Sequence, residues 1–225
     1  MACEILTIQM LKQKGMKRKK NMTLSFEKLS EKQVDVLKEI ANIGAGHATT
    51  ALFQMIGHRI DLQVPRVTVL PLSAVPDALG GPEKLVIGLF LKIYGDATGN
   101  ILIMFPVESA SLLLKMLLGD SKYDALALLD ESEISALKEL GNILSASYLN
   151  AIARFLNIML IPSVPGFSCD MAGAVVDYIL IELGKVANVA LLMETNFTSL
   201  QGNMNGHFFL LPDYNSLEIF LRSAK

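Results

Sequence analysis

Two polar clusters with the same spacing are the residues of this chain best suited to chemistry. They are Asp35, Glu39 and Asn42, and again Ser135, Glu139 and Asn142. Successive residues of an α-helix are rotated by about 100°, so each cluster falls on one side of a helix, with its carboxylate one turn before its carboxamide. We call these two clusters the first and the second stripe. Each stripe offers hydrogen-bond acceptors and donors to a bound partner.

A small residue follows each stripe one turn later, Gly46 in the first and Ala146 in the second. Either leaves room for the close approach of a partner surface. Glu and Asn on a single helix are usually ordinary solvated residues. Asn, however, is a mediocre helix former with no packing reason to stand in mid-helix, and here it occurs in both copies behind the same Glu.

The two stripes belong to an internal repeat. Residues 31–65 match residues 131–165 without a gap at an offset of 100, and the match ends at Pro65 and Pro165. We interpret residues 22–225 as one domain made of two repeats, about 29–120 and 129–225. Pro65 and Pro165 are expected to shape the strand that follows each helix, which is a structural role.

Both repeats read as a long helix, three strands and a short helix. The long helices are expected over about 31–57 and 131–157, each opened by a capping box, Ser30 with Gln33 and Asp130 with Glu133. Their apolar sides include Leu37, Ile40, Ile43, Ala48 and Met55, and Leu137, Leu140, Leu144, Ala151 and Phe155. The expected strands are 61–72, 84–94, 100–105, 159–164, 188–196 and 207–211, and the expected further helices are 107–118, 171–184 (an insertion) and 213–224. Short connections between strands favour an antiparallel sheet covered by helices, an α+β or two-layer α/β fold with a pseudo-twofold axis.

Composition excludes several classes of protein. Apolar residues make up 52% of the chain and charged residues 19%, which excludes intrinsic disorder of the whole chain. No apolar run has the roughly 20 residues that a spanning helix needs, so we expect a soluble protein without membrane contact. The two cysteines offer no disulfide framework, which fits a reducing cytoplasm. Residues 1–21 hold six basic residues and one acidic residue and are expected to be a disordered extension. The remaining 14 basic and 21 acidic residues make nucleic acid an unsuitable ligand.

No metal or nucleotide motif is present. Cys3 and Cys169 lie far apart, and His47, His58 and His207 have no metal-ligand spacing, so no metal and no cofactor are expected. The run from Asn42 to Thr49 shares only two glycines with a dinucleotide fingerprint. Its glycines are better explained by the close approach of another helix.

The doubled motif resembles the signature of the CheC-type phosphatases, the family of CheC, CheX and FliY. It runs Asp or Ser, three residues, Glu, two residues, Asn, twenty-two residues, Pro, and the resemblance extends from about Leu29 to Lys225. It implies a phosphatase that hydrolyses the aspartyl phosphate of a CheY-type response regulator. Asn42 and Asn142 would hold the attacking water, and Glu39 and Glu139 would pair with the regulator's active-site lysine. Asp35 and Ser135 would tune the helix or the docking surface.

This chemistry needs positioning and little else. The regulator supplies its own Mg²⁺ and lysine, and a carboxamide can orient a water because it both accepts and donates hydrogen bonds. The resemblance also implies a CheD-type receptor deamidase as a partner. Internal pairing of the repeats favours a monomer. The alternative is a non-catalytic docking protein of the chemotaxis or flagellar switch system, for which two Glu–Asn pairs would be unnecessary.

Overall fold

The structure is a computed structural model. It describes residues 30–57, 59–119, 129–183, 189–199 and 202–213, together with Ser216 and Ile219. The expected extension, residues 1–21, and most of the expected final helix, residues 213–224, lie outside these ranges.

Two long helices of 26 residues each are present as predicted, α2 (Glu31–Ile56) and α5 (Glu131–Leu156). Both predicted capping boxes form, because the cap residue and the residue three positions later each satisfy the other's backbone N–H. The helices end at left-handed residues, Gly57 with φ 74° and Asn157 with φ 52°.

Seven strands form one antiparallel sheet, which confirms the predicted class. The strands are β1 (Asp61–Pro71), β2 (Leu85–Gly95), β3 (Gly99–Pro106), β4 (Leu160–Pro162), β5 (Gly166–Met171), β6 (Val189–Ser199) and β7 (Gly202–Pro212). Their order is β1-β6-β7-β3-β2-β4, and β5 also pairs with β2.

The two repeats exchange their first strands. Strand β1 of the first repeat pairs with β6 of the second, while β4 and β5 of the second repeat pair with β2 of the first. Strands β3 and β7 join the two halves at the centre. Each hairpin is therefore completed by a strand from the other repeat, which the sequence did not predict.

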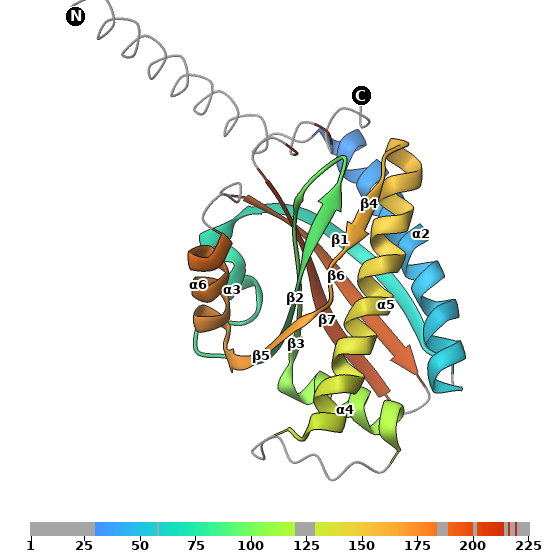
Figure 1. The fold of residues 1–225 in the computed structure, drawn as a ribbon, viewed down its shortest axis with the longest axis vertical. Coiled ribbons are helices and arrows are strands. Elements are labelled where there is room, and N and C mark those ends of the chain that lie inside the picture. The colour runs from blue at the N-terminus through green and yellow to red at the C-terminus, as the bar shows by residue number, and fades with distance from the viewer. Residues whose placement is uncertain are drawn as a thin grey trace, which may run out of the picture.

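Helices cover both faces of the sheet (Figure 1). Helices α2 and α5 lie on one face, α4 (Val107–Leu118) lies across the first turns of α5, and the main apolar core lies between these helices and the sheet. The 3-10 turn Leu72–Ala74, the short α3 (Val75–Ala78) and α6 (Ala172–Leu183) cover part of the other face over a second apolar cluster. The predicted helical insertion is thus α6, which follows β5 as α3 follows β1.

The first strands of the second repeat differ from the prediction at two points. The expected strand 159–164 ends at Pro162, and β5 was not predicted. The interruption has a local cause: the Ser163 hydroxyl, not a backbone carbonyl, accepts the N–H of Lys92 at 2.9 Å, and Pro165 has no N–H for the ladder. Strand β7 begins five residues before the expected His207.

Three residues assigned to the apolar sides of the long helices are exposed instead. They are Ile43 at 49%, Met55 at 39% and Phe155 at 45%. The buried side of α2 centres on Ala41, Gly44, Ala45 and Ala48, so Ile43 is turned outward, while Met55 and Phe155 lie in the last turns of their helices.

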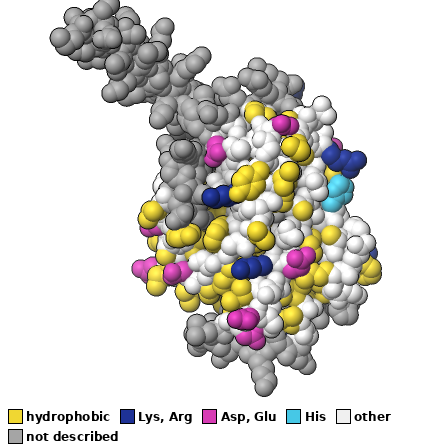
Figure 2. Space-filling model, viewed as in Figure 1, with side chains coloured by type: hydrophobic (Ala, Val, Ile, Leu, Met, Phe, Trp, Pro, Cys, Tyr) yellow, Lys and Arg dark blue, Asp and Glu magenta, His cyan; other side chains and the backbone are white. Residues whose placement is uncertain are grey.

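The surface carries no continuous basic area on the face drawn in Figure 2. Hydrophobic side chains are spread over that face, and lysines and arginines are few and separated there. Among the helices of the described ranges, none has the length and apolar character to cross a bilayer.

Candidate functional site

The first stripe lies on the outer side of α2. Asp35, Glu39, Asn42 and Gly46 are all exposed, as the sequence predicts. A Cβ atom added to Gly46 would meet no atom within 4 Å, so the surface beside Asn42 is open to a partner.

The carboxamide of Asn42 is nonetheless occupied by the protein's own backbone. Its Nδ2 donates to the carbonyls of Lys38 at 2.9 Å and Val64 at 3.2 Å, and its Oδ1 accepts the N–H of Val64 at 3.0 Å. Both amide hydrogens are therefore used, and one lone pair remains. Asn42 ties α2 to β1 through the residue that precedes Pro65.

A second side chain of α2 reinforces this connection. The hydroxyl of Thr49 accepts the N–H of Leu62 at 3.2 Å. Strand β1 is an edge strand whose register against β6 shifts between Gln63 and Arg66. Asn42 and Thr49 thus satisfy backbone groups that the sheet leaves unpaired, and Pro65 stands in the irregular segment, where its missing N–H costs no ladder bond.

The second stripe lies on α5 and is built differently. Ser135 and Glu139 are exposed, whereas Asn142 and Ala146 are half-buried. Among the described residues no hydrogen bond reaches the side chain of Asn142. The counterpart of Thr49 is Leu149, a fully buried residue that cannot bind the strand backbone.

The segment before the motif proline is packed against its helix in the first repeat and exposed to solvent in the second; we call these arrangements closed and open. Val64 is 1% exposed, and its repeat counterpart Val164 is 89% exposed. Residues 163–165 lie between β4 and β5, where the N–H of Ser163 bonds to the carbonyl of Lys92 at 2.8 Å. The same Asn, Val and Pro therefore adopt a closed arrangement in the first repeat and an open one in the second.

The two stripes do not form one joint site. Helix α2 packs beside β1, and α5 packs beside β4 and β5, which stand at opposite ends of the sheet. The structure holds two separate candidate sites, one per repeat.

The helices that carry the stripes cross closely at Gly44. A Cβ atom at Gly44 would lie 2.8 Å from the ring and 3.0 Å from the Cα of Tyr148. This confirms the close helix approach predicted for the glycines at Gly44, though not at Gly46. The Tyr148 hydroxyl lies 3.4 Å from that of Thr195, and burial raises its pKa to about 12.

Away from the stripes, the titratable groups that the structure describes are scattered over the fold. No three His, Cys, Asp or Glu side chains of the described ranges are grouped to hold an ion. His47 is exposed, and His58 lies outside the described residues. Burial lowers the pKa of His207, an effect that the charge of Glu194 partly opposes.

Sequence reasoning missed three features of the sites. Val64 and Thr49 were not recognised as partners of the first stripe, although the twenty-two residues between Asn42 and Pro65 end next to Val64. Phe53, 53% exposed, also lies on the first stripe, seven residues after Gly46. Its helical spacing was a usable signal.

The fold and the doubled stripe define a class: an internally duplicated α+β domain that presents a Glu–Asn pair on each of two long helices. The model of the CheC-like family matches residues 33–69 and 133–169, which are the two segments that bear the stripes and the strands beside them. The chain is 39% identical over 196 residues to the CheY-P phosphatase CheC of Bacillus subtilis, covering 86% of this chain and 94% of the relative. The chain belongs to the CheC-like family.

Two further comparisons give the reach of the similarity. The flagellar motor switch phosphatase FliY of Bacillus subtilis is 34% identical over 114 residues, which cover 51% of this chain and 29% of that protein. The crystal structure of FliY from Thermotoga maritima superposes with a TM-score of 0.68 at 18% identity, covering 87% of this chain and 97% of that one. At this identity the superposition supports the fold alone.

Proposed function

We propose that this protein is a phosphatase of a CheY-type response regulator, and that it hydrolyses the regulator's aspartyl phosphate. Membership of the CheC-like family and the similarity to the CheY-P phosphatase CheC over most of both chains support this activity. The observation that carries the mechanism is the pair of stripes, each with an exposed glutamate one turn before an asparagine.

The reaction needs a water held in line with the scissile bond. The oxygen of that water attacks phosphorus, the bond from phosphorus to the aspartyl oxygen breaks, and the products are inorganic phosphate and the free aspartate. The Mg²⁺ ion belongs to the regulator and compensates the phosphoryl charge. This chain contributes a carboxamide that orients the water and a glutamate that pairs with the regulator's lysine and fixes the register of the complex.

We further propose that the second repeat carries the larger share of the activity. Asn142 has no hydrogen-bond partner among the described residues, so its donors and acceptor are available to a water. Asn42 has both donors committed to Lys38 and Val64, and orienting a water through Nδ2 would first require breaking one of these bonds. Glu39 and Glu139 are both exposed and keep their proposed role in docking.

A single-turnover experiment tests the assignment. Loss of labelled phosphate from a CheY-type regulator is followed with the wild type, Asn42→Ala, Asn142→Ala and the double variant. We expect Asn142→Ala to remove most of the acceleration and Asn42→Ala the smaller part. The double variant should still bind the regulator but fall about 100-fold in rate, because only the positioned water is lost.

Stability separates the two asparagines independently of activity. Asn42→Ala leaves the buried backbone groups of Val64 unpaired and should lower the free energy of unfolding by about 1–3 kcal/mol. Asn142→Ala breaks no described bond and should change it by less than about 0.5 kcal/mol. If Asn42→Ala abolishes turnover and Asn142→Ala does not, the proposed ranking is wrong.

The partners follow from the family. We propose a CheD-type receptor deamidase as a second partner, a monomeric state and a cytoplasmic location, so the turnover experiment is run with and without the deamidase. If neither the wild type nor any variant accelerates dephosphorylation, with or without the deamidase, the protein is the non-catalytic docking protein of the alternative hypothesis.

A further inference from the structure

The strand beside each stripe is interrupted in the same way. In the first repeat, residues 64 and 65 lie opposite residue 195 of β6. In the second repeat, residues 163–165 lie opposite residues 91 and 92 of β2. Each strand thus carries one extra residue, which makes a bulge in both repeats. The bulge alone therefore does not decide between the closed and the open arrangement.

Burial by itself favours the closed arrangement in both repeats. Val64 is 1% exposed in the closed segment, whereas Val164 is 89% exposed in the open one. Closure of the second segment would remove the apolar side chain of Val164 from water, which is favourable. It would also bring the Val164 backbone to Asn142, as the Val64 backbone binds Asn42 at 3.0 and 3.2 Å. Some contact of the second repeat must therefore stabilise the open arrangement.

The hydroxyl of Ser163 makes that contact. It donates to the carbonyl of Val164 at 3.0 Å and accepts the N–H of Lys92 at 2.9 Å. The carbonyl of Val164 is the counterpart of the carbonyl that accepts a hydrogen bond from the asparagine of the first stripe. Ser163 therefore occupies the acceptor that a closed arrangement would present to Asn142.

The corresponding residue of the first repeat makes no such contact. Gln63 is exposed and pairs with Asn196 of β6 in the regular part of the ladder. Among the residues that the structure describes, none is hydrogen-bonded to the Gln63 side chain. A serine hydroxyl is short enough to bond to the backbone beside it and so to compete with a strand ladder. The two repeats thus differ at this position in the sense that their arrangements require.

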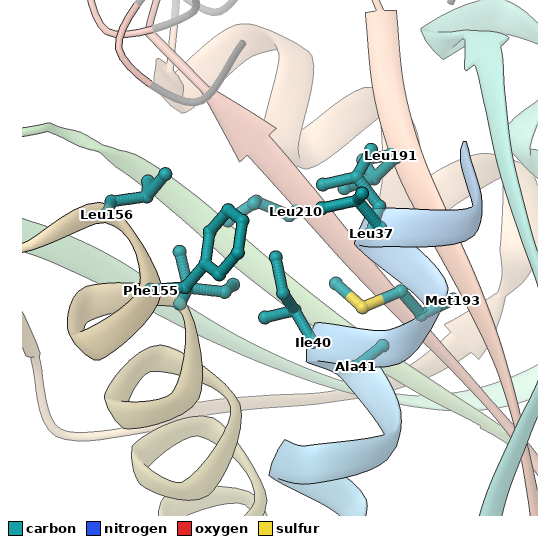
Figure 3. A pocket seen from close by; sticks show the side chains of 10 residues that line it. Leu37, Ile40, Ala41, Phe155, Leu156, Leu191, Met193 and Leu210 are labelled. Carbon is teal, nitrogen blue, oxygen red and sulfur yellow. The ribbon is translucent and has the colours of Figure 1, made fainter. Parts of the chain in front are cut away.

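The helix that bears Asn142 is fixed from its other side. Figure 3 shows apolar side chains of α5, α2 and the sheet converging on one another, among them Phe155, Leu37 and Met193. Met193 is 2% exposed, and close-packed side chains of this kind resist a shift of α5 against the sheet. A change between the two arrangements is therefore a change of residues 163–165, which join β4 to β5.

We propose that Ser163 is a positioning residue of the second site. By binding the carbonyl of Val164, its hydroxyl keeps the carboxamide of Asn142 free to hold the attacking water. Without the hydroxyl, the backbone carbonyl of Ser163 can accept the N–H of Lys92, whose own carbonyl already accepts the N–H of Ser163 at 2.8 Å. The segment then closes, and Asn142 binds the backbone of Val164. The effect on catalysis rests on the function proposed for the second stripe, whereas the effect on Asn142 does not.

The side-chain amide of Asn142 gives a readout that does not depend on activity. Nuclear magnetic resonance of isotope-labelled protein identifies its Nδ2 protons as the signals that Asn142→Ala removes, and those of Asn42 in the same way. In the wild type we expect the Asn142 protons to exchange with solvent several-fold faster than the hydrogen-bonded protons of Asn42. Ser163→Ala should slow the exchange of the Asn142 protons toward that of Asn42.

Matched variants separate the hydroxyl from the shape of the side chain. Ser163→Thr keeps a hydroxyl and should leave the exchange as in the wild type. Ser163→Val has the size of threonine without the hydroxyl and should act as Ser163→Ala does. Gln63→Ala changes the corresponding residue of the first repeat and should alter neither asparagine. Circular dichroism of each variant shows that the fold is kept.

Turnover tests the consequence for catalysis. At saturating protein, Ser163→Ala should lower the single-turnover rate about fivefold, which is the factor that one net hydrogen bond supplies. Affinity for the regulator should not change, because Glu139 stays exposed. Ser163→Thr should keep the rate of the wild type.

Three results would overturn the proposal. The Asn142 protons of the wild type could exchange as slowly as those of Asn42, which would mean that the second segment is closed in solution. Their fast exchange could survive both Ser163→Ala and Ser163→Val, and another contact would then stabilise the open arrangement. Slowed exchange without a loss of rate would mean that closure does not limit catalysis. If the exchange responds as expected but the wild type has no turnover, the proposed phosphatase function is wrong, and the effect of Ser163 on Asn142 stands.

Discussion

The two copies of the helix-and-strand unit carry the same Asn, Val and Pro but fold them differently. In the first, α2 is fastened to an unbroken strand of 11 residues through Asn42 and Thr49. In the second, the corresponding strand is divided into β4 and β5, and Val164 points into solvent. The comparison teaches that identical motif residues can adopt different conformations in the two repeats. Thr49 gives α2 a second hydrogen bond to the edge strand, and its counterpart Leu149 cannot form one.

The crossing of the two helices should be the most sensitive point of the comparison. Gly44 corresponds to Leu144, so Gly44→Leu makes the two copies alike. Because a Cβ already meets Tyr148 at 2.8 Å, the larger side chain must force the helices apart, and we expect a loss of about 3 kcal/mol in the free energy of unfolding. Urea unfolding measures it.

Gly46→Leu is the matched control for that substitution. Its site is open, and the gain in helix propensity should make it neutral or stabilising by up to about 0.8 kcal/mol. Equal costs at Gly44 and Gly46 would show that the helices do not cross closely at Gly44.

The two valines provide a smaller and sharper test. Val64→Ala removes buried methyl groups and should cost about 2 kcal/mol, whereas Val164→Ala should cost less than about 0.5 kcal/mol. Thermal unfolding of the pair at one pH is sufficient. A similar cost for both would mean that residues 163–165 close onto α5 in solution, and the difference between the repeats would then disappear.

The smallest expected effect concerns a histidine that distinguishes β7 from β3, a strand without titratable side chains. Burial lowers the pKa of His207, so the folded protein binds fewer protons than the unfolded chain near neutral pH. Its contribution to stability is present above about pH 6.5 and is lost as the pH falls through the folded pKa. His207→Gln should flatten this part of the pH dependence, measured by unfolding between about pH 7.5 and 5.5. An unchanged profile would assign the dependence to other groups.

Most of the architecture was predictable because its signals are local. The capping boxes fixed the starts of α2 and α5, and the repeat offset identified the two stripes before any contact was known. The exposed positions of Glu39 and Glu139 follow from helical periodicity alone.

What could not be predicted depends on contacts between distant residues. The hydrogen bonds between the Asn42 side chain and the Val64 backbone join residues 22 positions apart, in an irregular strand. The residue types Asn and Val do not by themselves predict this contact. To predict the break at residues 163–165, one would have to know that the Ser163 hydroxyl takes the place of a backbone carbonyl as the acceptor for the N–H of Lys92 on β2. The exchange of first strands cannot be predicted from the pattern of apolar and polar residues, because that pattern in β1 is compatible with pairing to either β2 or β6.

That exchange bears on how the protein folds and how it arose. Neither repeat can complete its own part of the sheet, because β1 pairs with β6, which lies about 130 residues later in the chain. Pairing across such separations makes folding slow relative to a protein of local contacts. It also suggests that a single ancestral repeat was stable only as a strand-swapped homodimer. Within one chain the two helices differ: α2 anchors β1 through Asn42, whereas no described residue is hydrogen-bonded to the side chain of Asn142.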